Sequence, residues 1–212
     1  MTKILLIRHG ESSHNLGKIY TGQTDAPLSE LGERQAEAVS RYVLEHYDVD
    51  VVCSSDLQRA VNTVRPLADA LGLEVETYRG LRELDVGLWA GRSHKELMIL
   101  FPENYQSFQA DMAHGRCDGG ESYAELYARA VRSIREIAAK YEGKTVAVAS
   151  HGGAIRCILA EWDGDGLEDV NKYSLMPNTG ISELICENGR FYYEKIGISE
   201  HLNETKKPLN IV

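Results

Sequence analysis

Short apolar runs recur along the chain at the length of a β-strand. Residues 3–7 (KILLI) form a continuous apolar run, which is the pattern of a strand buried on both faces. Residues 48–55 (DVDVVCSS), 73–78 (LEVETY) and 144–153 (KTVAVASHGG) carry similar runs further along the chain. The pattern therefore predicts four strands before the last part of the chain.

Between these runs, apolar residues recur every three or four positions, as on a helix with one buried face. Residues 29–47 begin at a serine suited to capping a helix, and residues 57–72 are predicted as a helix that is disturbed at Pro66 and stopped by a glycine. Residues 93–142 are mostly helical in pattern, and residues 154–162 form a further predicted helix. Helices thus alternate with the strands.

The last part of the chain carries two strand patterns close together. Residues 180–187 and 190–195 flank the short turn ENGR, which predicts a hairpin. The whole order predicts an α/β fold, namely a three-layer sandwich with a mainly parallel central sheet flanked by helices. A chain of 212 residues without internal repeats is also predicted to be a single domain over residues 1–212.

Composition narrows the class of protein. The chain holds 23 Lys and Arg against 32 Asp and Glu, a formal net charge of -9, which disfavours a nucleic acid or an anionic membrane as partner. The apolar run at the start is too short for a signal peptide or a membrane span, so we expect a cytoplasmic protein. The cysteines lack zinc-site spacing, and we expect them to be reduced packing residues: Cys53, Cys117, Cys157 and Cys186.

Two of the predicted buried strands end in histidine followed by glycine. His9 follows the first strand, with Arg8 just before it, and His151 ends the fourth. Arg59 and Glu83 follow the second and third strands, at the start of the next segment. Because the carboxyl ends of strands in an open α/β sheet border one crevice, we expect these five residues to meet there.

Two arginines, two histidines and a carboxylate suit phosphoryl transfer. Planar guanidinium groups neutralise phosphoryl oxygens without a metal ion. A neutral imidazole can act as the nucleophile, and a carboxylic acid can protonate the leaving oxygen. The set predicts an enzyme for a small phosphorylated metabolite that uses no cofactor.

At these residues the chain resembles the histidine phosphatase superfamily, the phosphoglycerate mutase-like group. Five blocks match that family in order, from about residue 3 to about residue 196. They are RHGES with the nearby Asn15, YTGQTDAPLSELG, SSDLQRAVNT, LRELDVGLWAG and ASHGGAIR. The tripeptide RHG alone is a weak signal, whereas five blocks in register are very unlike a chance match.

The resemblance implies a role for each of these residues. His9 would be the nucleophile that becomes a phosphohistidine, while Arg8, Arg59 and His151 would bind the transferring phosphoryl group. Glu83 would protonate the leaving alcohol and later activate water. Four further residues would line the substrate side of the pocket or offer a backbone amide to an oxyanion: Asn15, Thr21, Gly22 and Gly152.

Alternatives remain open at the level of sequence. Asp85 lies two residues after Glu83, and strand-like spacing would put both carboxylates on one face. A module that binds phosphorylated ligands without turnover is a second class of function, although an ionised Glu83 would repel phosphate there. A His/Glu metal site lacks close ligand spacing such as HExxH, so no metal ligand is predicted.

Residues 93–122 are expected to form a helical insert over the active site and to set specificity. A cofactor-dependent phosphoglycerate mutase is the alternative to a phosphatase, and it needs extra fixed positive charge for a doubly phosphorylated intermediate. Mutases of the family carry basic residues in this insert, whereas here only Lys95 and Arg116 stand against five carboxylates. The resemblance therefore favours the phosphatase branch, with water as the acceptor. The substrate and the oligomeric state are not indicated.

Overall fold

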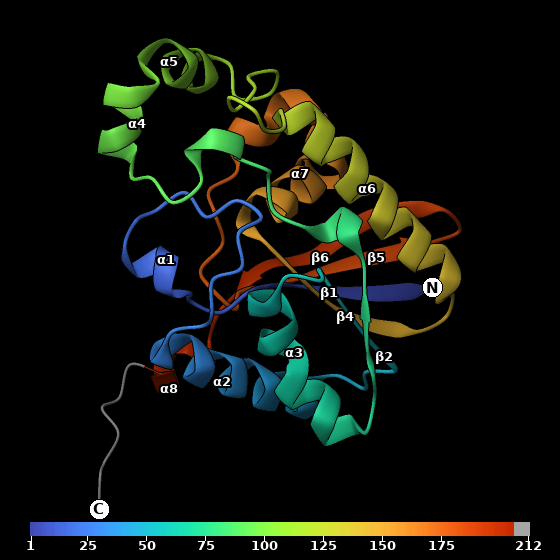
Figure 1. Cartoon of the computed structure of the whole chain (residues 1–212). Coiled ribbons are helices and arrows are strands. Elements are labelled where there is room, and N and C mark those ends of the chain that lie inside the picture. The colour runs from blue at the N-terminus through green and yellow to red at the C-terminus, as the bar shows by residue number, and fades with distance from the viewer. Residues whose placement is uncertain (206–212) are drawn as a thin grey trace, which may run out of the picture.

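In the computed structural model, which describes residues 1–205, a six-stranded sheet lies between two layers of helices (Figure 1). The strands are β1 (Thr2–Arg8), β2 (Val51–Ser54), β3 (Val75–Thr77), β4 (Thr145–Ser150), β5 (Ile181–Glu187) and β6 (Arg190–Ile198). Their order across the sheet is β3-β2-β4-β1-β5-β6. The first four are parallel, and β5 and β6 are added as an antiparallel hairpin. The predicted α/β fold is confirmed.

Helices cover both faces of the sheet. The longer ones are α2 (Glu30–His46), α3 (Gln58–Leu71), α6 (Tyr123–Lys140) and α7 (Gly152–Asp163). The shorter ones are α1 (Ser13–Leu16), α4 (His94–Leu100), α5 (Pro102–Ala110), α8 (Leu202–Thr205) and the 3-10 turns η1 (Arg79–Leu81), η2 (Gly87–Trp89) and η3 (Leu167–Lys172). α2 and α3 pack on one face, whereas α6 and α7 pack on the other.

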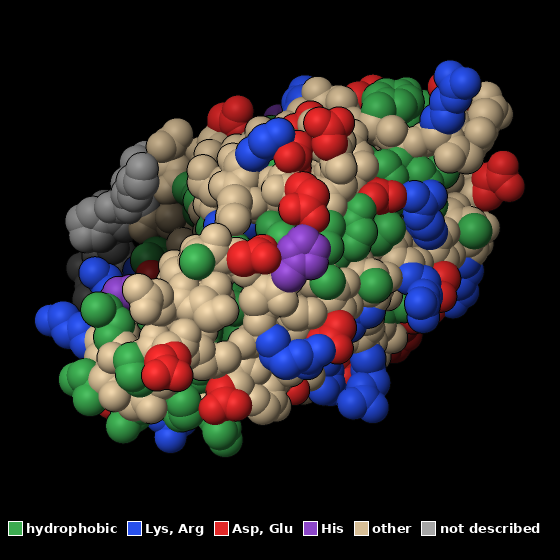
Figure 2. Space-filling model, turned by 90° about the horizontal axis from the view of Figure 1, so that it is seen from above, with side chains coloured by type: hydrophobic (Ala, Val, Ile, Leu, Met, Phe, Trp, Pro, Cys, Tyr) green, Lys and Arg blue, Asp and Glu red, His purple; other side chains and the backbone are tan. Residues whose placement is uncertain are grey.

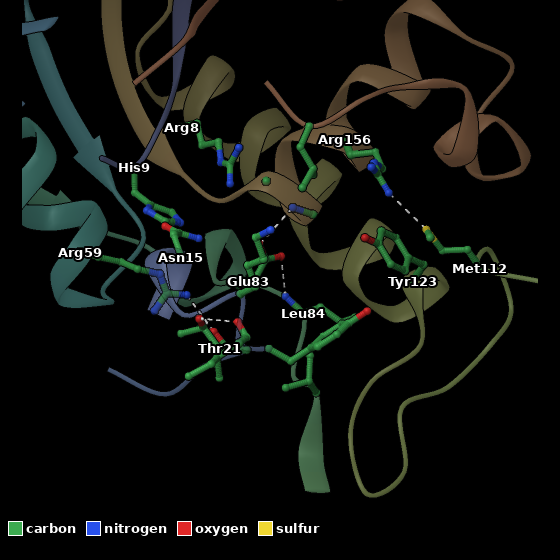
Figure 3. Close-up of a pocket in the computed structure, with 18 of the residues that line it drawn as sticks. Arg8, His9, Asn15, Thr21, Arg59, Glu83, Leu84, Met112, Tyr123 and Arg156 are labelled. Atoms are coloured by element: carbon green, nitrogen blue, oxygen red, sulfur yellow. Dashed lines mark hydrogen bonds between the residues drawn. The ribbon is translucent and has the colours of Figure 1, made fainter. Parts of the chain in front are cut away.

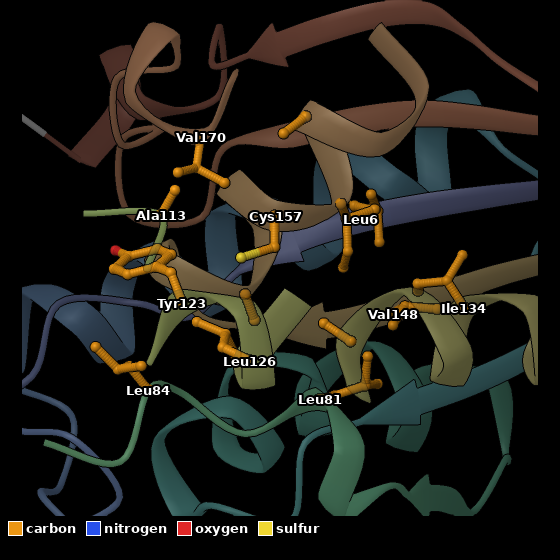
Figure 4. Close-up of a cluster of buried hydrophobic side chains, with 14 of the residues drawn as sticks. Leu6, Leu81, Leu84, Ala113, Tyr123, Leu126, Ile134, Val148, Cys157 and Val170 are labelled. Carbon is orange, nitrogen blue, oxygen red and sulfur yellow. The ribbon is translucent and has the colours of Figure 1, made fainter. Parts of the chain in front are cut away.

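The side chains of β1 explain why the first apolar run is continuous. Leu5 and Ile7 belong to the buried cluster under α2 and α3, while Ile4 and Leu6 belong to the cluster under α6 and α7. Successive side chains of a strand point to opposite faces, so a strand covered on both faces has no solvent side. Figure 4 shows the second cluster, where Leu6 lies near side chains of α6 and α7.

Several predicted element boundaries change in the structure. α3 continues through Pro66, which corrects the predicted disturbance there. Proline removes one helix hydrogen bond, and the carbonyl left over belongs to Asn62, an exposed residue that water can reach. β3 keeps only three of the six predicted residues because it pairs with β2 alone, at the edge of the sheet. β6 extends past the predicted end to Ile198, which pairs with Ile181.

The segment between η2 and α6 packs into the same core as the sheet. α4 and α5 are helical as predicted, whereas residues 111–122 form turns. Phe108 of α5 has its ring centroid 5.1 Å from that of the fully buried Trp89, in the cluster that also holds Leu6. The organisation as one domain over residues 1–212 stays a prediction, and residues 206–212 lie outside the described part of the chain.

The surface and the cysteines show little that is unusual. On the face seen in Figure 2, basic and acidic side chains are interspersed, and no extended basic area is visible. Within residues 1–205, no helix combines the length and the apolar character that crossing a membrane requires. All four cysteines are free thiols, and three of them are buried, as expected for packing residues.

Candidate active site

The parallel pairing of β1 with β4 brings the two histidines together. Arg8 is in register with Ser150, and the His9 N–H donates to the carbonyl of Ser150 at 2.9 Å. The imidazole rings of His9 and His151 therefore lie with their centroids 5.1 Å apart. The repeated His-Gly motif is thus explained, because both histidines follow neighbouring strands at the same height.

A cavity of about 310 Å³ opens at this end of the sheet (Figure 3). Eight of the nine residues predicted for the site line it: Arg8, His9, Asn15, Thr21, Gly22, Arg59, Glu83 and Gly152. The ninth, His151, is fully buried and lies against the ring of His9 instead of on the cavity wall. Segments far apart in sequence therefore meet in one place.

The imidazole of His9 is neutral at ordinary pH. Burial, together with the nearby charges of Arg59 and Arg8, lowers the pKa of His9 to about 3. Its Nδ1 lies 2.7 Å from the carbonyl oxygen of Gly10, so in the neutral ring Nδ1–H donates to this acceptor. Nε2 is then the nitrogen that carries the lone pair. The side-chain amide of Asn178 also holds the backbone here, donating to the His9 carbonyl at 2.8 Å.

His151 is a second buried neutral histidine. Burial, with the charge of Arg59 as the next cause, holds its pKa well below the usual value. Its Nε2 lies 2.8 Å from the Ser55 hydroxyl oxygen, while Nδ1 has no hydrogen-bond partner among residues 1–205. Leaving a buried ring nitrogen without a hydrogen-bond partner costs free energy of folding. Nδ1 of His151 is therefore available to a ligand beside His9.

The two predicted phosphate-binding arginines are held in place by backbone carbonyls. Arg59 is 1% exposed, and its guanidinium donates to Gly22 at 2.8 Å and to Thr24 at 2.9 Å. Arg8 donates to the carbonyl of Met176, and its buried Nε has no partner within the described residues. A guanidinium has five N–H donors, so both arginines keep donors for a ligand.

Glu83 faces the cavity, and its carboxylate is fixed by two backbone amides. Leu84 N–H donates to one oxygen at 2.8 Å and Gly153 N–H to the other at 3.1 Å. A Cβ at position 153 would lie 2.3 Å from that carboxylate, so only glycine allows this approach. Behind the site, Arg129 donates to the Glu83 carbonyl at 2.7 Å and pairs with Glu121 at 2.7 Å.

Asp85, the alternative carboxylate, lies away from the cavity. It accepts the N–H of Gly87 at 3.0 Å and does not line the cavity wall. The expectation that both carboxylates share a face is wrong, because the segment between η1 and η2 is irregular and not a strand. The geometry therefore distinguishes Glu83 from Asp85.

Asn15, Thr21 and Gly22 come from the segment between β1 and α2. Asn15 closes a capping box at α1, where its side-chain oxygen accepts the Ser12 N–H at 2.9 Å. Gly22 has a φ of +54°, a conformation that favours glycine, and its carbonyl holds Arg59. This segment is thus hydrogen-bonded to Arg59 through its backbone.

Sequence reasoning missed several residues of the cavity wall. The structure adds Lys18, Tyr123 and Arg156, together with Phe108, Gln109 and Met112 from the insert. Arg156 follows Gly152 by four positions, so helical periodicity places both on one face of α7, and this signal was present in ASHGGAIR. Nothing local marks the insert residues, because they reach the cavity only through tertiary packing.

The charged groups on the cavity wall are mostly cationic. They are Arg8, Lys18, Arg59, Arg156 and a single carboxylate, Glu83. No group of three or more His, Cys, Asp or Glu side chains able to hold a metal ion occurs in the described part of the chain. The electrostatics of the cavity therefore favour an anionic ligand held by guanidinium groups.

Comparisons with known proteins agree with this site. Residues 4–199 match the histidine phosphatase superfamily (branch 1). Phosphoserine phosphatase 1 of Hydrogenobacter thermophilus is 31% identical over 204 residues, which are 96% of each chain. A probable phosphoglycerate mutase of Yersinia enterocolitica is 35% identical over 164 residues, which are 76% of this chain and 74% of that one. The alpha-ribazole phosphatase of Shigella flexneri superposes with a TM-score of 0.85 at 26% identity, covering 92% of this chain and 96% of that chain. As its sequence blocks predicted, the chain belongs to the histidine phosphatase superfamily and is an enzyme of the histidine phosphatase type.

Proposed function

We propose that this enzyme hydrolyses a small phosphorylated metabolite through a phosphohistidine intermediate and needs no metal ion. The observation that carries the proposal is the neutral imidazole of His9, whose Nδ1 is bound to Gly10, beside two guanidinium groups fixed by backbone carbonyls. A nucleophile must keep a lone pair, and the pKa of about 3 leaves Nε2 of His9 unprotonated at neutral pH.

In the first step, Nε2 of His9 attacks phosphorus and the bond from phosphorus to the leaving oxygen breaks. Glu83, in its protonated form, gives its proton to that oxygen, so the product leaves as an alcohol. The free N–H donors of Arg8 and Arg59 bind the phosphoryl oxygens, whose charge is spread over three atoms in the transition state. When the Ser55 hydroxyl donates to Nε2 of His151, Nδ1 of the neutral ring carries the proton. In this scheme that N–H is a further donor to the phosphoryl group.

In the second step, water attacks the phosphohistidine. The Glu83 carboxylate takes a proton from this water, and the bond between phosphorus and Nε2 breaks. Inorganic phosphate leaves, His9 regains its lone pair, and Glu83 is again an acid. Asn15, Thr21, Gly22 and Gly152 surround the leaving group or the phosphoryl oxygens in this scheme.

Metal independence gives the direct test of this function. We expect the purified enzyme to release inorganic phosphate from members of a panel of phosphomonoesters at equal rates with and without a chelator. The physical reason is that two fixed guanidinium groups supply the charge that Mg²⁺ supplies in other phosphoryl-transfer enzymes. Phosphate release is measured colorimetrically, with the His9→Ala variant as the blank.

Two outcomes would contradict the proposal. Activity that disappears with chelator and returns with a divalent cation would refute metal independence. Tight binding of phosphorylated compounds without any turnover would instead identify the non-catalytic binding module.

We further infer that water is the usual acceptor, so the enzyme is not a cofactor-dependent phosphoglycerate mutase. The insert contributes Phe108, Gln109 and Met112 to the cavity wall and no basic side chain. Arg116 of the insert pairs with Glu125 at 2.5 Å. The insert therefore supplies no basic side chain for a second phosphate on a bound intermediate, and the only further cations that the described residues place on the wall, Lys18 and Arg156, come from other segments.

The prediction is that 3-phosphoglycerate with a trace of the bisphosphate yields little 2-phosphoglycerate. The isomers and inorganic phosphate are followed together by ³¹P nuclear magnetic resonance. Rapid isomerisation without phosphate release would show that the enzyme is a mutase.

A further inference from the structure

We propose that Arg156 binds a carboxylate on the leaving-group side of the substrate, which makes phosphate esters of small hydroxy acids the substrate class. This inference rests on the proposed function and assigns the part of the cavity that the phosphoryl group does not use. In Figure 3, Arg156 and Met112 lie on one side of Glu83, whereas His9 and Arg59 lie on the other. A proton donor belongs beside the leaving oxygen, so the region beyond Glu83 holds the leaving group.

The charge of the cavity exceeds what one phosphate can neutralise. The wall carries four cations, Arg8, Lys18, Arg59 and Arg156, and one carboxylate, in a chain whose net charge is -9. A phosphomonoester dianion neutralises two positive charges at most, and Arg8 and Arg59 already suffice for it. Arg156 is near enough to Arg8 that its charge helps to lower the pKa of Arg8, after the effect of burial. A separate anion at Arg156 would relieve this repulsion.

The hydrogen-bonding state of Arg156 also indicates a missing ligand. Its Nη1 lies 3.2 Å from the thioether sulfur of Met112, which is a weak acceptor, and its buried Nε has no partner among residues 1–205. Within the same part of the chain it forms no ion pair with a carboxylate. Arg129, by comparison, donates to three backbone carbonyls and pairs with Glu121. Arg156 therefore keeps donors for a ligand, as does Arg8, whose Nε is also unpartnered among residues 1–205.

The geometry and the charge of the guanidinium favour a carboxylate over a second phosphate. A guanidinium fork binds a planar carboxylate through two parallel hydrogen bonds, and one positive charge matches one negative charge. Met112 contacts the fork, and other apolar side chains, among them Phe108 and Leu175, line the same cavity. These side chains offer contacts to a short carbon chain. The phenol of Tyr123 also contacts Arg156. Burial raises the pKa of Tyr123, and the charge of Arg156 and a side-chain hydrogen bond with it oppose that rise.

The test compares two probes that differ only in the carboxylate, O-phosphoserine and phosphoethanolamine. We expect wild-type enzyme to prefer O-phosphoserine, and Arg156→Gln to reduce that preference in kcat/KM by roughly 10- to 100-fold, mostly through KM. Arg156→Lys keeps the charge without the fork and is expected to restore part of the preference. Arg132→Gln removes an exposed arginine of α6 that does not line the cavity, and it should keep the wild-type preference.

A binding measurement separates this inference from the proposed function. In the His9→Ala background, calorimetry gives the affinity for both probes without turnover, before and after Arg156→Gln. If Arg156→Gln removes the difference in affinity between the two probes, the carboxylate site is supported. This holds even if wild-type enzyme hydrolyses neither probe, and in that case only the proposed function fails. Equal affinities in the parent protein, or equal losses for both probes in the Arg156→Gln variant, would overturn the assignment of Arg156.

Discussion

Replacing His9 with alanine is expected to lower kcat by roughly 10⁴- to 10⁶-fold, the scale seen when a covalent nucleophile is removed. In the proposed mechanism the ring Nε2 forms the bond to phosphorus, and His9 carries the only imidazole among the described residues that line the cavity. Steady-state phosphate release measures the loss. In wild-type enzyme, rapid quenching under alkaline conditions should also trap a phosphorylated protein that is labile in acid.

Two controls make this result specific to the nucleophile. His46 lies exposed on α2, stacked on Tyr42, and His46→Ala should keep wild-type turnover. The His9→Ala variant should still bind inorganic phosphate, because Arg8 and Arg59 are held by backbone carbonyls and not by His9. Near-normal turnover of His9→Ala would mean that another group attacks phosphorus.

Glu83→Gln should produce the second-largest loss, and its size should depend on the leaving group. For alkyl phosphates we expect a decrease of roughly 10²- to 10⁴-fold, since an alkoxide leaves poorly without a proton. For an aryl phosphate such as p-nitrophenyl phosphate the decrease should be much smaller. Glutamine keeps an oxygen that can accept a hydrogen bond from Leu84 or Gly153, so the variant removes the acid with little change of shape. Steady-state kinetics on both substrates measures the difference.

Asp85→Asn is the matched control, because Asp85 is the neighbouring carboxylate that points away from the cavity. It should show the same kinetics as wild type on both kinds of substrate. Equal losses on alkyl and aryl substrates in the Glu83→Gln variant would argue against a general acid at Glu83. A loss in Asp85→Asn that depends on the leaving group would assign the acid to Asp85 instead.

Much of the fold, and the meeting of His9 and His151 at one edge of the sheet, could be predicted from the sequence. A run such as residues 3–7 has no polar face, and only a central strand covered on both sides buries it completely. The carboxyl end of such a strand opens at the edge of the sheet, so the positions of His9 and His151 follow from their places after two apolar runs. The hairpin near the end of the chain followed from its short turn in the same way.

The part of the cavity around Glu83 and Arg156 was decided only by tertiary structure. Spacing could not separate Glu83 from Asp85, because that segment follows no regular period and its direction is set by Arg129, Glu121 and Gly153. Met112 reaches Arg156 across 44 positions of sequence, a contact that no local pattern encodes.

The physical reason for this difference is how far apart in the sequence the interacting residues lie. Periodicity of apolar residues records which face of an element is buried, and this fixes strands, helices and the residues at their ends. Hydrogen bonds and charges between separate loops depend on how the packed elements finally lie. For this protein, the sequence therefore determined that His9 and the two arginines, Arg8 and Arg59, lie together at the ends of the strands, while packing decided that Glu83 and not Asp85 faces the cavity and where Arg156 lies.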